Sequence, residues 1–206
     1  KAIKTVNFGK TSITIVPNIT GSRSDVDSAM YVDDNRQRFL NINDCRWNDS
    51  FVRELQSRTN ASYQALDLIA LGYTGAGTFP QTYFDIATER EQLLAAAERK
   101  KSQFFRQYQR YCSSLPARHH LPFAGNYILG GKLSKLNHYR GVADAVEVTE
   151  FDDKAIVLGD LGRGMIDLSS DSVQNRRVKK YKKSDLDTGI DRVVDRMMDY
   201  ERDIKT

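Results

Sequence analysis

The first third of the chain alternates short apolar runs with polar turns, which is the pattern expected of β-strands. The β-branched run at 13–16 ends at Pro17, and a polar loop follows it. Two further apolar runs, 28–32 and 38–42, are separated by the polar turn Asp-Asp-Asn at 33–35. A short polar turn between two apolar runs predicts a β-hairpin.

After residue 45 the pattern changes to helices that alternate with strands. The Asn-Asp-Ser sequence at 48–50 can cap a helix, and the apolar run 66–71 predicts a buried strand. A long helix is expected from the capping box Thr-Glu-Arg-Glu at 88–91 to Pro116, and a short strand at 118–123. The apolar positions expected on the inner face of the long helix are Leu94, Ala97, Phe104, Tyr108, Tyr111 and Leu115. This alternation predicts an α/β fold with parallel strands joined by crossover helices.

Three loops follow the predicted parallel strands, and such loops gather at the carboxyl ends of the strands, where ligands bind in open α/β sheets. The first loop presents Asp44, our main candidate for a metal ligand or catalytic carboxylate. The alternative is an aspartate of a turn or helix start. In the second loop Tyr73, Gly75 and Gly77 are candidates for substrate binding, since glycines let the backbone approach a phosphate. A plain glycine turn is the alternative there.

The last third is less regular. The apolar runs 155–158 and 165–168 predict a small hairpin, and an amphipathic helix is expected from Leu186 to the C-terminus. We therefore predict two domains, residues 1–148 and a hairpin-plus-helix extension at 149–206. The basic cluster at 176–183 has only Tyr181 as an interleaved aromatic, which favours a solvated loop over a nucleic-acid surface.

Composition sets the general class of the protein. The chain has 206 residues, 40% of them hydrophobic and 28% charged, which is enough apolar material for one substantial core. No apolar run approaches the ~20 residues that cross a bilayer, so no membrane association is expected. The two cysteines, Cys45 and Cys112, do not form a disulfide framework, so a reducing cytoplasm is the expected location. Cys45 is expected to be a buried apolar thiol.

Three segments carry a resemblance to a known family: Leu-Asn-Ile-Asn-Asp-Cys at 40–45, the Gly-rich segment 68–80, and Leu-Pro-Phe-Ala-Gly-Asn-Tyr at 121–127. They resemble the C-terminal half of metallo-β-lactamase-fold proteins, in particular the metal-binding domain of CMP-N-acetylneuraminate hydroxylase-like proteins and related bacterial metallo-hydrolases. The resemblance implies a half or partial αββα sandwich with a one- or two-metal site at one sheet edge. It makes Asp44 the acidic ligand of a divalent metal, zinc or iron, with manganese as a further option.

The chain departs from the family pattern in its histidines. The His-x-His-x-Asp-His motif is absent from the sequence, and Ala124 stands where many relatives have a final histidine. Adjacent histidines His119 and His120 lie on a predicted strand, so they point to opposite faces, and a structural or surface role is favoured for both.

One carboxylate cannot hold a catalytic metal, so an N-terminal half or a partner chain is expected to supply the histidines. A half-sandwich would leave a sheet face uncovered, which predicts association. Two functions follow. The chain is part of a metal-dependent hydrolase, or of an oxygenase acting on a sugar-nucleotide-like small molecule. Alternatively, it is a non-catalytic scaffold or binding subunit without a complete metal site.

Overall fold

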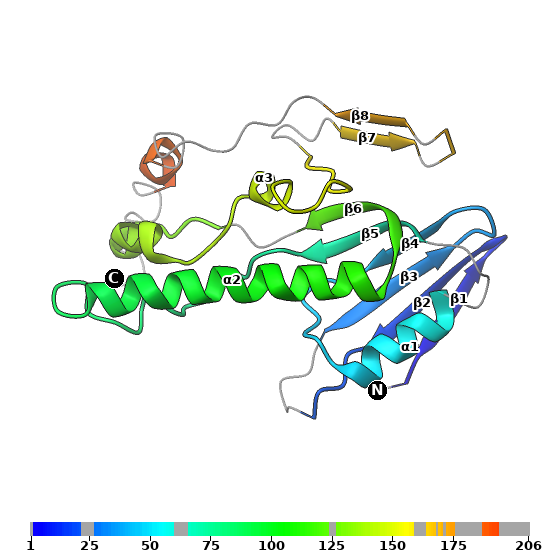
Figure 1. Cartoon of the computed structure of the whole chain (residues 1–206), viewed down its shortest axis with the longest axis horizontal. Helices are drawn as coiled ribbons and strands as arrows, with labels where there is room; N and C mark the ends of the chain where they lie inside the picture. Colours follow the sequence, from blue (N-terminus) through cyan, green and yellow to red (C-terminus); the bar gives the residue numbers. More distant parts are fainter. Residues whose placement is uncertain are drawn as a thin grey trace, which may run out of the picture. The chain divides into compact units, whose positions relative to one another are not determined.

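A computed structural model of the chain describes residues 2–21, 27–59, 66–123, 127–158, 164–167, 169–170, 172–175 and 187–193 (Figure 1). Its main feature is a six-stranded sheet whose strands lie in the order of the sequence. The strands are β1 (Lys4–Phe8), β2 (Thr11–Pro17), β3 (Ser28–Asp33), β4 (Arg38–Asn41), β5 (Leu66–Gly72) and β6 (Ala117–Phe123).

The sheet is mixed, and the sequence patterns predicted most of it. Strands β1 to β4 are antiparallel, whereas β4, β5 and β6 are parallel. The predicted hairpin and the predicted parallel strands are therefore confirmed. Strand β1 was not predicted, because all five of its residues are exposed and no buried face marked it as a strand.

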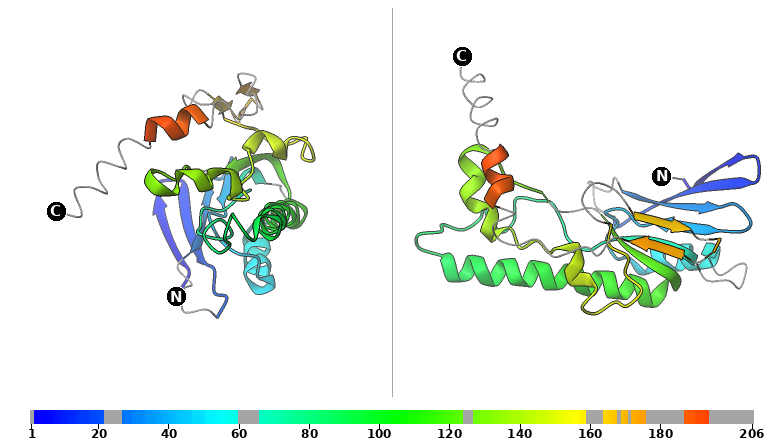
Figure 2. Two further views of the ribbon diagram at one scale, coloured as in Figure 1. Left: turned by 90° about the vertical axis from the view of Figure 1, so that its left-hand side faces the viewer. Right: turned by 90° about the horizontal axis from the view of Figure 1, so that it is seen from above.

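Two helices connect the parallel strands. Helix α1 (Asp49–Thr59) follows β4, and helix α2 (Arg90–Ser114) follows β5. Helix α1 and the C-terminal part of α2 lie on the same face of the sheet (Figures 1 and 2). Asn48 caps α1 as predicted, since its Oδ1 accepts hydrogen bonds from the backbone N–H groups of Ser50 (3.0 Å) and Phe51 (3.2 Å).

The core lies between this face and the two helices. Tyr31, Leu40 and Ile69 are aligned on three neighbouring strands and are all buried. From the helices, Leu55 and Tyr108 are fully buried as well. The helix-facing side of the sheet is therefore a continuous apolar layer.

Near the N-terminal end of α2, the buried residue is one position before the predicted one. Leu94 was expected in the core but is 45% exposed, whereas Leu93 is fully buried. Leu93 lies three residues before Ala96 and four before Ala97, which are both buried, so Leu93 continues the buried stripe. The predictions for Tyr108, Tyr111 and Leu115 are confirmed, since all three are buried.

The predicted hairpin after residue 154 is wrong in its pairing. Ala155 forms a parallel bridge with His120 of β6, and strand β7 (Gly164–Asp167) pairs with β8 (Ser172–Asn175). The backbone of His120 explains the difference, because its N–H donates to Lys154 O (3.0 Å) and its carbonyl accepts from the N–H of Ile156 (2.8 Å). The apolar run at 155–158 thus begins with a single bridge to β6 and does not pair with β7.

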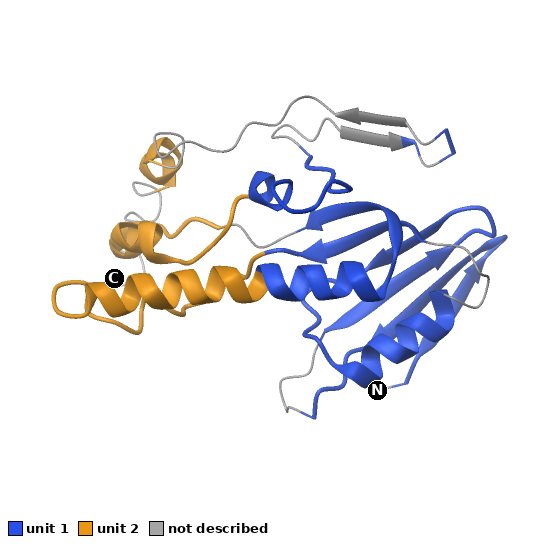
Figure 3. Ribbon diagram, in the orientation of Figure 1, with its two compact units in different colours: residues 1–73, 105–124, 145–178 blue, residues 74–104, 125–144, 179–206 orange. Residues whose placement is uncertain are grey.

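The chain forms two compact units (Figure 3). Unit 1 comprises residues 1–73, 105–124 and 145–178, and contains the large sheet and α3 (Ala145–Val148). Unit 2 comprises residues 74–104, 125–144 and 179–206, and contains the 3-10 helix η2 (Gly131–Tyr139) and a helix at 187–193. The predicted domain boundary after residue 148 stays a prediction.

Some sequence predictions lie outside the described residues. These are Ala124, Gly125, the basic cluster at 176–183, and the C-terminal helix apart from residues 187–193. Within the described part of the chain, every helix is too short or too polar to cross a bilayer.

Candidate metal-binding sites

Asp44 lies in the turn that ends β4. The turn is closed by a hydrogen bond from Cys45 N–H to Ile42 O (3.2 Å), and Asn43 adopts a left-handed φ of 52°. The Asn41 side chain supports this conformation, because its Oδ1 accepts the N–H of Asn43 at 2.8 Å. Asp44 itself is exposed. The local sequence therefore places a solvent-facing carboxylate at the carboxyl end of a parallel strand, as predicted.

The ends of β4 and β5 lie side by side. Ile42 N–H donates to Ala70 O (3.0 Å), and a Cβ atom added to Gly72 would lie 3.5 Å from Asn43 O. The first two loops were predicted to meet at one end of the sheet, and they do so up to Tyr73. Tyr73 is the last residue of unit 1 in this part of the chain. Tyr73 is buried, with 6% of its surface exposed.

Gly75 and Gly77 belong to unit 2 and have different surroundings. A Cβ atom at Gly75 would clash with the ring of Phe104, so the packing of that ring explains the glycine. A Cβ atom at Gly77 would meet nothing within 4 Å. The Gly77 carbonyl accepts hydrogen bonds from Gln81 Nε2 (2.6 Å) and Tyr127 OH (2.8 Å). Substrate binding by Tyr73, Gly75 and Gly77 stays a prediction.

A second group of metal-ligand side chains lies on the helix-covered face of the sheet. Cys112 comes from α2, His120 from β6, and Asp152 from the turn after α3. One ligand atom from each lies within 4.8 Å of the other two. His120 Nδ1–H donates to Asp152 Oδ2 at 2.8 Å, and the same oxygen accepts the hydroxyl of Tyr108 at 2.8 Å.

Burial controls the chemistry of this group. The side chains of His120 and Asp152 are 6% and 10% exposed. Burial, reinforced by the charge of Asp152, raises the pKa of Cys112 to about 12, so the thiol is protonated at neutral pH. Within the described part of the chain, the second ring nitrogen of His120, Nε2, is buried without a hydrogen-bond partner. Buried polar atoms are normally paired, so this nitrogen has unused bonding capacity.

Sequence reasoning did not find this group. His120 and Asp152 are 32 residues apart, and Asp152 lies in a segment without a regular pattern. Tertiary contacts bring the two side chains together, among them the parallel bridge of Ala155 to β6 and the hydrogen bond from Tyr108 to Asp152. The prediction that neighbouring histidines point to opposite faces agrees with the register, which aligns His119 with Leu68 and His120 with Ile69. Asp44 is not part of any group of three such ligands among the residues that the structure describes.

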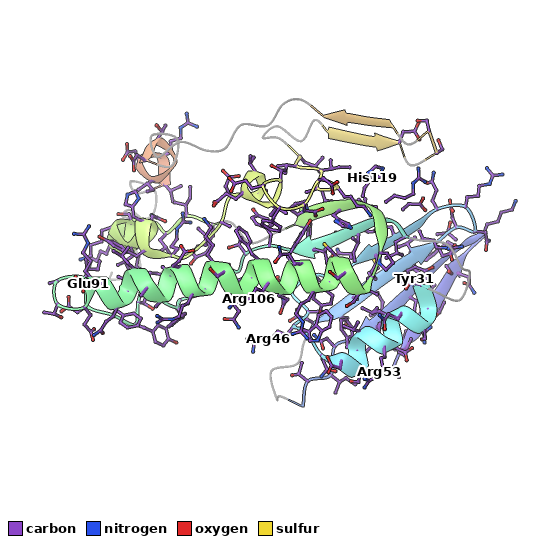
Figure 4. The ribbon with its side chains drawn as sticks, in the orientation of Figure 1. Tyr31, Arg46, Arg53, Glu91, Arg106 and His119 are labelled. Atoms are coloured by element: carbon purple, nitrogen blue, oxygen red, sulfur yellow. The ribbon has the colours of Figure 1, made fainter. Side chains whose placement is uncertain are left out.

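The sheet face opposite the helices carries an apolar row that is not buried, although Leu66, Ala70 and Ala117 on the same face of β5 and β6 are buried. One row of aligned residues crosses all six strands: Val6, Ile13, Val32, Phe39, Leu68 and His119. No member of this row is buried, and the side chains become more exposed toward β1, where Val6 is 52% and Phe8 is 65% exposed. Figure 4 labels one residue from each face, Tyr31 from the covered face and His119 from the open face. We call this surface the open face.

Comparison with known proteins gives weak likenesses only. No protein-family model and no curated protein matches the chain. Among solved structures, the chain is similar to CmlA, a diiron beta-hydroxylase from Streptomyces venezuelae, with a TM-score of 0.42 and 10% identity over 75% of this chain and 32% of that one. A mutant of CmlA beta-hydroxylase gives a TM-score of 0.43 and 11% identity over 75% and 31%.

The metallo-beta-lactamase fold protein YhfI from Bacillus subtilis gives a TM-score of 0.39 and 14% identity, over 77% of this chain and 51% of that one. The chain therefore spans about a third of the CmlA chains and about half of YhfI. Likenesses at these TM-scores carry no functional argument.

Proposed function

We propose that this chain is one half of a metal-dependent enzyme of the metallo-β-lactamase type, with Asp44 as a metal ligand. The observation that supports this most directly is the open face. Parallel strands such as β4 to β6 normally have both faces covered, and here the helices cover one face of the sheet while an apolar row crosses the other. A layer of protein that packs on this row would complete the domain.

The layer that fits the open face is a second β-sheet. The row consists of β-branched and aromatic residues in register, together with Leu68 and His119, and such a surface interdigitates with a similar surface when two sheets stack face to face. The second sheet would come from an N-terminal half or from a partner chain. It would also bring the histidine ligands that this chain does not supply.

Asp44 suits the role of a single oxygen ligand. Its carboxylate is exposed at the carboxyl end of β4, where ligands bind in open α/β sheets. Together with imidazoles, a carboxylate can hold zinc, iron or manganese. Such a metal, when bound, activates water for hydrolysis or, if it is iron, supports oxygen chemistry. The turn at Asn43 would fix the direction of the carboxylate.

The substrate side of the proposal concerns the loop after β5. In it, Tyr73, Gly75 and Gly77 would contact a small molecule of the sugar-nucleotide kind. Gly77 is the better candidate of the two glycines, because it is exposed and no neighbouring atom explains the missing side chain. The packing of Phe104 already explains Gly75.

A second candidate function is a non-catalytic scaffold or binding subunit. It is favoured by the setting of Asp44, which belongs to no group of three possible metal ligands among the described residues. In this case the open face would bind its partner as proposed, and Asp44 would be an ordinary turn residue.

Metal content distinguishes the two functions. Protein purified without chelators, with any bound partner, would be measured by mass spectrometry for zinc, iron and manganese. If Asp44 is a ligand, Asp44→Ala should lower the metal content to a small fraction of the wild-type value. Any metal bound by Cys112, His120 and Asp152 is left out of this comparison. The matched control is Glu91→Ala, which removes an exposed carboxylate from α2 (labelled in Figure 4). Equal metal content in the wild type and both variants would contradict the enzyme proposal and favour the scaffold.

A further inference from the structure

We propose that Cys112, His120 and Asp152 form a separate metal site that takes zinc or a similar divalent cation. It lies on the helix-covered face of the sheet, between α2, β6 and the turn after α3. The inference does not depend on the proposed role of Asp44. A thiolate, an imidazole and a carboxylate are the three ligand types that zinc prefers.

The fold holds the ligands close to the required positions. His120 is fixed by β6, and the hydrogen bonds from its backbone to Lys154 and Ile156 tie the segment after Asp152 to the strand. The carboxylate is fixed in turn, because Asp152 Oδ2 accepts the Tyr108 hydroxyl and Oδ1 accepts the N–H of Lys154 (3.1 Å). Cys112 lies one helical turn after Tyr108 on α2, so it faces the same place.

The distances allow a metal after a small movement. Zinc bonds of ~2.0–2.3 Å in a tetrahedral arrangement put the ligand atoms about 3.3–3.8 Å apart. In this structure the atoms lie within 4.8 Å of one another, so the longest separation would contract by about 1 Å, while the hydrogen-bonded Nδ1 of His120 and Oδ2 of Asp152, 2.8 Å apart, would open by about 0.5 Å. Cys112 is only partly buried, and this gives the ion a way in. Three protein ligands leave the fourth position for water.

Charge balance favours a divalent ion in this place. With the thiol ionised and the carboxylate charged, the two negative ligands neutralise one divalent cation, which lowers the cost of burying all three charges. His120 enters neutral, with its hydrogen on the ring nitrogen that does not bind. The bond that breaks is the S–H bond of Cys112, and its proton leaves to solvent, so binding releases one proton per metal.

Tyr108 supports the site without being a ligand. Burial raises the pKa of its hydroxyl, which therefore keeps its proton and donates to Asp152. A metal held together with Asp152 would bind Nδ1 of His120, which lies 2.8 Å from Asp152 Oδ2, and the ring hydrogen would then be on Nε2.

Cobalt spectroscopy tests the proposal on the whole chain. Cobalt(II) added to metal-free protein should produce the near-ultraviolet charge-transfer band of a thiolate–cobalt bond, and zinc should remove it. Cys112→Ser should abolish the band. The matched control is Cys45→Ser, because Cys45 is the other free thiol and its pKa is also raised by burial to about 12. Asp44→Ala should keep the band, which separates this site from the one proposed at Asp44.

Two further readouts on wild-type protein protect the test against a misfolded variant. At a free zinc concentration about a hundred times the Kd, the melting temperature should rise by about 5–10 °C. In weakly buffered solution, zinc should release about one proton per chain. Absence of the band and of both zinc effects in wild-type protein would overturn the proposal. So would a band that persists in Cys112→Ser, and Tyr108, His120 and Asp152 would then form a hydrogen-bonded core network only.

Discussion

At the scale of single residues, Asp67 connects three strands. It lies buried on β5, and its Oδ2 accepts the backbone N–H of Arg38 at the start of β4 at 2.7 Å. Its Oδ1 accepts Nη1 of Arg118 on β6, also at 2.7 Å. One carboxylate therefore satisfies a backbone donor on one neighbouring strand and a charge on the other.

We predict that Asp67→Ala lowers the free energy of unfolding by about 2–4 kcal/mol, because it leaves the Arg38 N–H without its acceptor and Arg118 without its counter-ion. Urea denaturation measures the change. The control is Glu54→Ala, which breaks a half-exposed pair with Arg58 within α1 and should cost less than about 0.5 kcal/mol. A similar effect of both variants would show that Asp67 does not connect the strands as described.

The buried thiols predict a loss of stability at alkaline pH. Burial raises the pKa of Cys45 from 9.0 to about 12, so the folded chain holds the thiol proton more tightly than the unfolded chain. This stabilisation is complete below about pH 9 and disappears as the pH rises toward about 12. The urea midpoint of metal-free protein should fall in this window, and less steeply in Cys45→Ala. An equal slope in the variant would contradict the assignment.

At the scale of elements, the cap of α1 is the local feature that decides where a helix begins. We predict that Asn48→Ala destabilises the protein by about 1 kcal/mol, since two N–H groups at the start of α1 lose their acceptor. Asn48→Asp keeps a side-chain oxygen in this place and should retain most of the stability. Thermal unfolding compares the two variants, and equal losses would mean that the packing around Asn48 matters more than the cap.

The elements also show how far the sequence predicts the fold. Caps, the hairpin turn and buried strands depend on neighbouring residues, so Asn48, β3–β4 and β5 were predictable. The partner of Ala155 was not, because the bridge to His120 depends on which backbone groups tertiary folding brings together. The same is true of the candidate sites. The position of Asp44 follows from the strand before it, whereas the meeting of His120 with Asp152 follows from tertiary contacts, that bridge among them.

At the scale of the whole molecule, the open face predicts association. We expect the isolated chain to elute from size-exclusion chromatography as more than a monomer, with light scattering giving the mass. Val6→Lys combined with Phe8→Lys should shift the chain toward the monomer, because both side chains are exposed apolar residues of the open face. The control is Tyr83→Lys, an aromatic residue of unit 2 that is 66% exposed.

A well-behaved, cooperatively folding monomer of the wild-type chain would contradict the half-domain proposal. The proposed N-terminal half or partner chain carries the histidines. If it does not displace a dimer of this chain, the open face pairs with a second copy. Displacement of the dimer by that half or partner chain, together with restored metal content, is the expected result.

The bridge between Ala155 and His120 also limits how chains can join by strand addition. On the outer side of β6, the N–H and carbonyl of His120 are already bonded, and Pro122 has no N–H to offer. At the other end of the sheet, β1 has a strand neighbour on one side only. Among the described residues, growth of the six-stranded sheet by backbone pairing is therefore expected at β1. In two copies paired β1 to β1, the unpaired edge of each β1 would be hydrogen-bonded to the other copy. Association by this route would therefore end at a dimer and would not build a fibre.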